Sequence, residues 1–368
     1  MKRYERIENR LFGVGKYVLM LVALCTVACS DDTSDNDGSG GKLQLLSYSK
    51  PFQEAPASRT VTVPASYVPF ADIYPDATTS FPRIGVYLMA GTEGSLHSFQ
   101  YLADGTWKSN AIVKEPNYYI YGFMPTMSSM QTSIAPIGAA TDYVNGATLT
   151  LQGVPSLTLE DPCVTVGILG VTSPTADANV QLGNFAYTTQ EEGHNYVYML
   201  FDHLYAGIRF SIRVDEQYSR LRTIHLKSLK LQTGVQGKAN INVTLVPNSN
   251  PISNVTYTLS TGAPGVDLSL YTDTGTGKVL TTTYESVGQM ACYAPGIRNN
   301  LKLVTEYDVY DRKGNLVREG CVAENLLSSN LPNLTRGQRR TVRLTVNPTY
   351  LYQLSEPELD NPTISITE

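Results

Sequence analysis

The stretch MLFDHLYAGIRFSIRV, residues 199–214, decides the fold, because its second half alternates apolar and polar side chains. The apolar set is Ile208, Phe210, Ile212 and Val214, and the polar set is Arg209, Ser211 and Arg213. A period of two places successive side chains on opposite faces of a strand, so one face can be buried while the other meets water. We therefore expect a half-buried β-strand here.

The same alternation recurs along the chain, at 148–151, 241–245 and 341–346. Turn-forming residues separate such runs, and 311–315 between LVTEYDVY and NLVREGCV predicts a hairpin. No stretch holds a helical period with caps for three turns; YSRLRTIHL (218–226) comes nearest, and its apolar residues suit a strand better. The pattern predicts an all-β chain of two β-sandwich domains.

The polar run TTQEEGHN, residues 188–195, separates two strand-rich halves. We place the domain boundary there, with an N-terminal sandwich over 42–192 and a C-terminal sandwich over 193–347. Residues 348–368 then form a C-terminal tail.

The N-terminus contains YVLMLVALCTVACSDD, residues 17–32, after five basic residues. Its apolar run, 17–28, is too short for a permanent membrane span and has the length of a signal-peptide core. The small residue Ala28 before Cys29 predicts a lipoprotein signal peptide over 1–28, with the lipid on Cys29. An ordinary secretory signal is the alternative, and it changes the anchor but not the compartment.

Residues 29–41 follow as a tether, acidic and then glycine-rich, with too few apolar side chains to pack. Its start, Ser30, Asp31 and Asp32, resembles the surface-export signal of lipoproteins from Gram-negative anaerobes. This places the protein on the outer face of the cell outer membrane.

Charge and cysteine content narrow the function. The 368 residues include 28 Lys plus Arg and 33 Asp plus Glu, a net charge of −5, which disfavours nucleic-acid binding. Besides Cys29, three cysteines lie beyond the signal region: Cys163, Cys292 and Cys321. An odd, widely spaced set is no disulfide framework. A bridge between Cys292 and Cys321 stays open, with free buried thiols as the plainer expectation.

The histidines and the glycine-rich turns carry no catalytic or metal-binding motif. The four histidines, His97, His194, His203 and His225, have no metal-ligand spacing, and we expect His203 to be a packed residue. GTGK (275–278) lacks the Ser or Thr and the upstream glycine of a phosphate loop. We expect no enzyme, no metal site and no cofactor.

Five segments in this order give the chain a family resemblance: IGVYLMAG (84–91), DGTWKS (104–109), YYIYGFMP (118–125), GVPSLTLEDPCVTVG (153–167) and MLFDHLYAGIRFSIRV (199–214). Together with VRLTVNPTYLYQLSEPELDNPTISITE (342–368), they resemble the fimbrillin family, the type V pilins. The most specific element is an aromatic-x-His-Leu segment, here Phe201, His203 and Leu204 with Ile208.

The resemblance implies two transthyretin-like Greek-key sandwiches and assembly by donor-strand exchange. A trypsin-like protease would cut after an arginine that follows the first strand, here KLQLLSYSK (42–50) and the expected exposed loop PFQEAPAS (51–58). Arg59 is the candidate for cleavage, with Thr60 as the new N-terminus. An uncleaved loop arginine is the alternative.

The tail ends in TISITE (363–368), in which Ile364 and Ile366 share one face. These two residues make it a candidate donor strand, while an ordinary last strand of its own domain is the alternative. Its partners would be other copies or related fimbrial subunits. A host or bacterial surface ligand and the position as stalk, tip or anchor stay open. A surface lipoprotein that binds glycan through tyrosines and Trp107 is the competing function.

Overall fold

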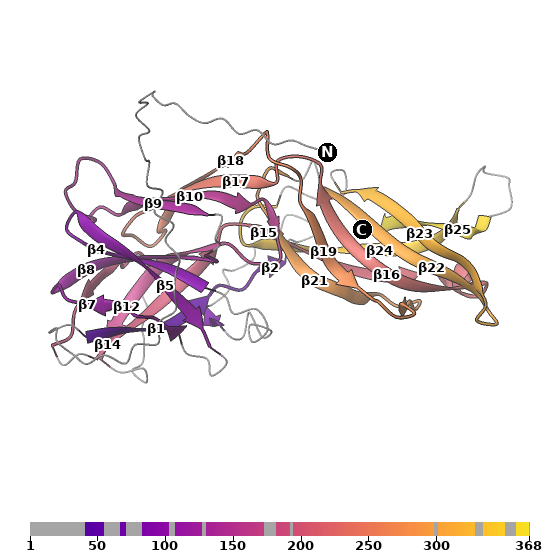
Figure 1. Cartoon of the computed structure of the whole chain (residues 1–368), viewed down its shortest axis with the longest axis horizontal. Coiled ribbons are helices and arrows are strands. Elements are labelled where there is room, and N and C mark those ends of the chain that lie inside the picture. Colours follow the sequence, from indigo (N-terminus) through magenta and orange to yellow (C-terminus); the bar gives the residue numbers. More distant parts are fainter. Residues whose placement is uncertain are drawn as a thin grey trace, which may run out of the picture. The chain divides into compact units, whose positions relative to one another are not determined.

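The computed structural model describes residues 41–54, 67–70, 83–102, 107–126, 130–172, 182–191, 194–297, 301–327, 334–349 and 358–367. Residues 39–368 group into one compact unit. Nearly all regular structure in the described part is strand, with one four-residue helix, α2 (Glu216–Ser219), whose N-cap is Asp215 (Figure 1). The all-β prediction is therefore confirmed.

The largest sheet has ten strands and contains the first strand of the described chain. Its main order is β3 (Val68–Pro69), β1 (Gly41–Ser49), β14 (Asn195–His203), β12 (Cys163–Val171), β8 (Asn117–Met124), β4 (Arg83–Ala90), β5 (Glu93–Tyr101) and β6 (Trp107–Lys108). The short strands β13 (Ala186–Thr188) and β7 (Ile112–Val113) pair with β8 and β1.

This sheet bends so that its two ends meet. The indole N–H of Trp107 on β6 donates to Ser47 Oγ on β1 at 3.0 Å. The enclosed face forms a hydrophobic core with residues from β1, β4, β8, β12 and β14, among them Leu43, Val86 and Ile120. Strand β4 is buried along nearly its whole length because it contributes to cores on both faces of the sheet.

The opposite face of the large sheet packs against a four-stranded sheet. The order of that sheet is β18 (Ile252–Leu259), β17 (Lys238–Leu245), β10 (Ala147–Pro155) and β9 (Gln131–Pro136). The predicted alternation holds here, since Ile241, Val243 and Leu245 are fully buried and pair across the ladder with Leu151, Leu149 and Ala147.

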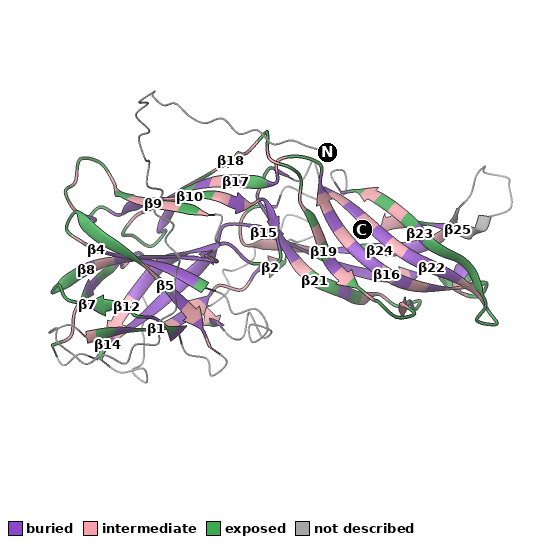
Figure 2. Ribbon diagram, viewed as in Figure 1, coloured by how far each residue is buried: buried purple, intermediate pink, exposed green. Residues whose placement is uncertain are grey.

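Two further sheets form a second packed pair. One contains β11 (Leu157–Thr158), β21 (Glu285–Tyr293), β15 (Ala206–Val214), β24 (Gln338–Thr349) and β2 (Gln53–Glu54), with β25 (Glu358–Thr367) also on β24. The other contains β19 (Asp267–Thr272), β16 (Arg222–Thr233), β22 (Leu301–Asp311) and β23 (Leu316–Leu326), with β20 (Lys278–Val279) on β16. Their shared core includes Phe210, Leu229, Tyr307 and Leu344, and Figure 2 shows the buried residues running along these strands.

The hairpin predicted around 311–315 is β22–β23. Asp311 Oδ1 accepts the backbone N–H groups of Lys313 and Asn315, and Gly314 has φ of 84°, a conformation that glycine adopts without steric cost. The nonapeptide 218–226 starts at a helical residue and continues into β16, as its apolar spacing indicates.

Strand pairing divides the chain differently from the expected boundary at residues 192 and 193. β14 follows that boundary, yet it pairs with β1 and β12; β17 also follows it, yet it pairs with β10. Conversely, β2 and β11 precede it and join the sheet of β24 and β21. Alternation shows which residues are strands, but partners such as Leu149 and Val243, 94 residues apart, leave no local signal, so the boundary could not be placed from the pattern.

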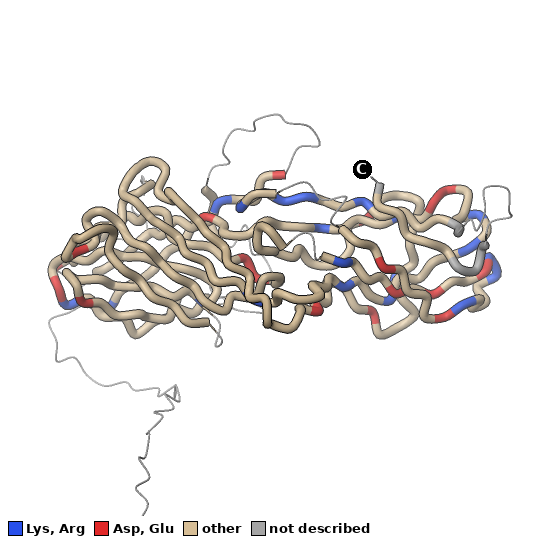
Figure 3. The backbone as a smooth tube through the Cα atoms, turned by 90° about the horizontal axis from the view of Figure 1, so that it is seen from above, with Lys and Arg blue, Asp and Glu red and all other residues tan. Residues whose placement is uncertain are grey.

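Charge is spread unevenly over the strands (Figure 3). β8, β10 and β12 contain no Lys, Arg, Asp or Glu, whereas β16, β22, β23 and β24 each carry at least three.

Candidate functional site

The candidate site is built around residues 41–54, which we call the N-terminal segment. Its strand β1 lies inside the ten-stranded sheet. It pairs in parallel with β14, from Leu43↔Asn195 to Ser49↔Phe201, and on its other edge with β3 and β7. β1 therefore completes the sheet, as expected for a strand whose removal opens a groove.

The side chains of β1 alternate as its sequence predicts. Leu43 and Leu45 point into the enclosed core and are only 2% and 4% exposed. Ser47 accepts the hydrogen bond from Trp107, whose ring also lies 5.3 Å from Phe70 and 4.9 Å from Tyr101. Trp107 is consequently a buried residue that β1 covers.

Residues 51–54 differ from the expected exposed loop. Phe52 is buried, and its ring stacks on the His203 imidazole with the centroids 3.8 Å apart. Gln53 and Glu54 form β2, which pairs in parallel with Gln338 and Arg339 of β24. The difference arises because Phe52 is a large aromatic side chain that gains from burial. Its burial places the following residues, 53 and 54, beside β24.

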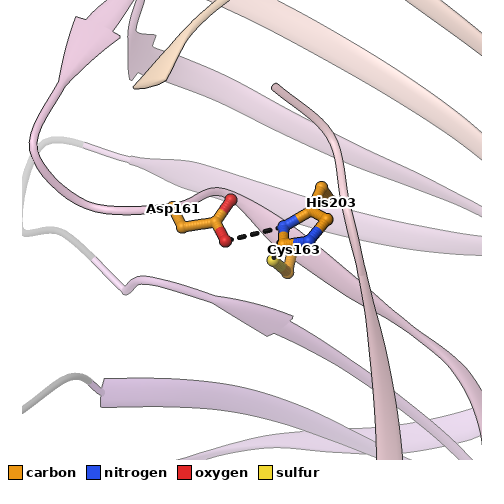
Figure 4. A group of neighbouring side chains, drawn as sticks. All are labelled: Asp161, Cys163 and His203. Atoms are coloured by element: carbon orange, nitrogen blue, oxygen red, sulfur yellow. Dashed lines mark hydrogen bonds and ion pairs between the residues drawn. The ribbon is translucent and has the colours of Figure 1, made fainter. Parts of the chain in front are cut away.

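A buried polar cluster lies directly beneath Phe52. His203 Nδ1 is 2.7 Å from Asp161 Oδ2 and 3.6 Å from Cys163 Sγ, and all three side chains are buried (Figure 4). The strand β14 supplies His203, while Asp161 lies just before β12 and Cys163 is the first residue of that strand. Asp202, next to His203, accepts from Arg336 at 3.1 Å and lies 3.8 Å from Lys50 Nζ.

Chemically, this cluster is suited to holding structure. Asp161 and Cys163 both face the same imidazole nitrogen, whereas a thiol–imidazole–carboxylate triad needs them on opposite nitrogens. Burial raises the pKa of the Cys163 thiol, as do the carboxylates of Asp161 and Asp202, so the thiol keeps its proton. Among the described residues, this is the group whose ligand atoms come close enough, within 4.8 Å, to hold a metal ion. The 2.7 Å bond from Nδ1 to Asp161 favours a hydrogen-bonded network instead.

The groups around the His203 imidazole favour its charged form. Burial lowers its pKa, but the Asp161 carboxylate, which also hydrogen-bonds to it, raises the pKa above its usual value with help from Asp202 and the Lys50 carbonyl. The result is a buried ion pair with Phe52 as its cover. The expectation that His203 is a packed residue is confirmed.

The C-terminal tail forms β25 on the outer edge of β24. Val346 pairs with Ile364 and Leu344 with Ile366 in an antiparallel ladder. Ile364 is 2% exposed, Ile366 is half-buried, and Tyr307 donates its hydroxyl to the Pro362 carbonyl at 2.6 Å. In this single chain, the tail thus has the arrangement of an ordinary last strand, which was the alternative to donation.

The remaining predicted site residues are distributed as follows. Cys29, Arg59 and Thr60 lie outside the described residues. Cys163, Cys292 and Cys321 are free and buried, so no bridge joins Cys292 to Cys321. Because Trp107 is 8% exposed, it cannot serve as the surface platform on which the glycan-binding alternative relied. Within the described part of the chain, no helix is long and apolar enough to cross a membrane.

Comparison with known proteins finds no matching family model and no matching curated protein. Among solved structures, the chain is similar to a candidate cell adhesion protein from Bacteroides uniformis, with 10% identity and a TM-score of 0.38 over 90% of this chain and 99% of that one. A fimbrial protein from Bacteroides vulgatus shares 14% identity with a TM-score of 0.38, over 79% of this chain and 92% of the other. A candidate cell adhesion protein from Bacteroides fragilis has 11% identity and a TM-score of 0.40, over 89% and 97%. Values this low leave the function to be inferred from the chain's own geometry.

Sequence reasoning missed Phe52, Asp161 and Asp202 as members of the site. Asp161 and His203 are 42 residues apart, and no spacing rule joins them. The one available signal was Phe52 itself, an aromatic residue within a run otherwise typical of a solvated loop.

Proposed function

We propose that this protein is a structural subunit of a fimbria that polymerises by donor-strand exchange. The observation that carries the proposal is the contrast between the two ends of the described chain: β1 is paired on both of its edges, whereas β25 pairs with β24 alone. The stretch 55–66, which contains Arg59, directly follows the N-terminal segment.

Cleavage after Arg59 would free the N-terminal segment from the rest of the chain. Its departure would leave the β14 edge unpaired and the core around Trp107 open, an arrangement that invites a strand from another chain. Strand β25 has the alternation that such an edge accepts. Each isoleucine buried in the groove would stabilise the joint by about 1.5 to 3 kcal/mol, and each ladder hydrogen bond would add about 1 kcal/mol.

The same edge of β24 carries both β2 and β25, at 338–339 and 343–349. When β2 leaves with the N-terminal segment and β25 leaves to join a neighbour, this edge becomes free over its whole length. The exchange therefore changes strand pairing in both packed pairs of sheets.

In this proposal the precursor is a lipoprotein anchored through Cys29 in the outer membrane, and the matured subunit is part of a surface fibre. A chain with both a removable first strand and a donor tail suits the stalk. Adhesion to a host or bacterial ligand would follow from the assembled fibre, and no chemistry is required of the subunit.

Proteins sheared from cells test the proposal. N-terminal sequencing should give Thr60, and a gel run without boiling should show a ladder that collapses on heating. The double variant Ile364→Asp, Ile366→Asp should lose the ladder while its monomer still folds, and Thr363→Asp, on the outward face of the tail, is the matched control. A blocked Cys29 N-terminus with a single monomer band would contradict the proposal.

A further inference from the structure

The Phe52 side chain occupies a slot whose walls belong to strands that remain after the N-terminal segment departs. His203 of β14 forms the floor, with its ring 3.8 Å from the Phe52 ring and inclined to it by 23°. Gly207 of β15 forms one side. A Cβ at Gly207 would lie 3.0 Å from Arg339 Cβ, 3.1 Å from Met290 Sδ and 3.4 Å from Phe52 Cδ1, so the glycine lets Arg339 and Met290 pack closely beside the ring.

Charges flank this slot on both sides along the segment. Two residues before Phe52, Lys50 lies 3.8 Å from Asp202. Two residues after it, the Glu54 carboxylate accepts from the Arg339 guanidinium. Asp202 and Arg339 also stay with the body of the chain. The body therefore presents an acidic group, an aromatic slot and a basic group in line with the groove of β1.

The slot closes over groups that tolerate exposure poorly. His203 is fully buried, and its Nδ1 lies 2.7 Å from Asp161 Oδ2. A flat ring stacked on the imidazole excludes water from this pair, and a cation–aromatic contact adds attraction when the imidazole is protonated. A short aliphatic side chain would leave part of the imidazole face uncovered.

We infer that the slot is a specificity pocket for the strand that replaces the N-terminal segment, and that a strand with an aromatic side chain over His203 binds there most tightly. The tail stretch 363–368 has no aromatic residue, so the preferred occupant is an extended strand of a related subunit, in which the aromatic residue follows the alternating residues that fill the Leu43 and Leu45 positions. Lys or Arg two residues before it and Asp or Glu two residues after it improve the match. This inference rests on the proposed strand exchange and names the chemistry of the partner.

The experiment uses the full chain with a specific protease site placed in 55–66. The cut protein is unfolded in urea and refolded with equimolar peptides of residues 41–54, either unchanged or carrying Phe52→Tyr, Phe52→Leu or Phe52→Ala. Native mass spectrometry measures which peptide each protein molecule holds. Because only the peptides vary, misfolding of a protein variant cannot produce the result.

We expect the unchanged and Phe52→Tyr peptides to be held about equally, Phe52→Leu roughly several-fold less, and Phe52→Ala roughly tenfold to a hundredfold less, the effect of losing a buried aromatic side chain. A Leu45→Asp peptide, which should not bind, controls for the strand position. The inference would be overturned if the protein held the Phe52→Ala peptide within about twofold as often as the unchanged peptide. It would also be overturned if the refolded protein held no peptide at all. Loss of the heat-sensitive ladder from cells, with the aromatic preference intact, would contradict only the fimbrial function.

Discussion

The two end strands of the described chain, β1 and β25, are held in different ways. β1 pairs with β14 from Leu43 to Ser49 and has short pairings with β7 and β3 at its two ends, and its inward side chains close a core around Trp107. β25 pairs along one edge only, and polar bonds such as that from Asn325 Nδ2 to the Ile364 carbonyl, 2.8 Å, help hold it. A strand inside a sheet cannot leave without opening the sheet, whereas an edge strand can.

In the proposed assembly, this difference gives each end its part. Release of β1 would need a covalent cut, since thermal motion would have to break its pairing with β14 and its shorter pairings with β3 and β7, and expose a core at once. Release of β25 costs one ladder and the burial of Ile364 and part of Ile366. Under this proposal the uncut chain keeps β1 in place, while its tail needs to break only the β24 ladder to exchange.

Truncation of core side chains should give the largest difference between the two end strands. Leu43→Ala and Leu45→Ala should each lower the free energy of unfolding by about 2 to 5 kcal/mol, because the enclosed core cannot close the cavity. The double variant Ile364→Ala, Ile366→Ala should lower the free energy of unfolding by only about 1 to 3 kcal/mol. The tail can detach while the rest stays folded, so the loss cannot exceed the free energy with which the tail binds to β24. Urea denaturation of the uncut chain measures both. Equal losses at the two ends would contradict the comparison.

Hydrogen exchange should sharpen the same difference in the wild-type chain. Amides in 43–49 should exchange only through global unfolding, whereas those in 362–366 should exchange earlier through local opening of the edge. Mass spectrometry of peptides from the exchanged protein follows both regions in one sample. Strand β17, internal in its own sheet, is the reference for global protection.

The sequence predicted the strands well and their partners poorly. The alternation at 208–214 and 241–245 identified β15 and β17, and the Asp311 turn identified the β22–β23 hairpin, because these signals are local. The pairing of β10 with β17 and the contact of Phe52 with His203 depend on residues far apart in sequence. Of the candidate site, β1 and the buried state of His203 were predicted, while Asp161, Asp202 and the β2 segment were not.

A pH dependence should distinguish the cluster under the N-terminal segment from the tail. His203 has a raised pKa in the folded chain, so its contribution to stability is fully present below about pH 6.5 and is lost as the pH rises through the folded pKa. Unfolding free energies should therefore fall across that window. His203→Gln should abolish this part of the slope, and His194→Gln, at an exposed position, should leave it unchanged.

The ion pairs around the segment should have the smallest effects. Lys50→Ala and Glu54→Ala should each change the free energy of unfolding by less than about 1 kcal/mol, because both pairs are partly exposed to solvent. Salt should reduce the differences further. A loss as large as that of Leu45→Ala would show that charge, and not apolar burial, holds the segment in place.

Cross-linking between copies tests donor-strand exchange most directly. One population carries Val197→Cys, at the position that β1 covers through Leu45, and a second carries Ile366→Cys in the tail. After cleavage following Arg59 and mixing, we predict that a short thiol cross-linker joins Val197→Cys of one copy to Ile366→Cys of the other, and that the uncut mixture gives no such product. If the cut and mixed copies remain unlinked, with each tail still on its own β24, donor-strand exchange does not occur in this protein.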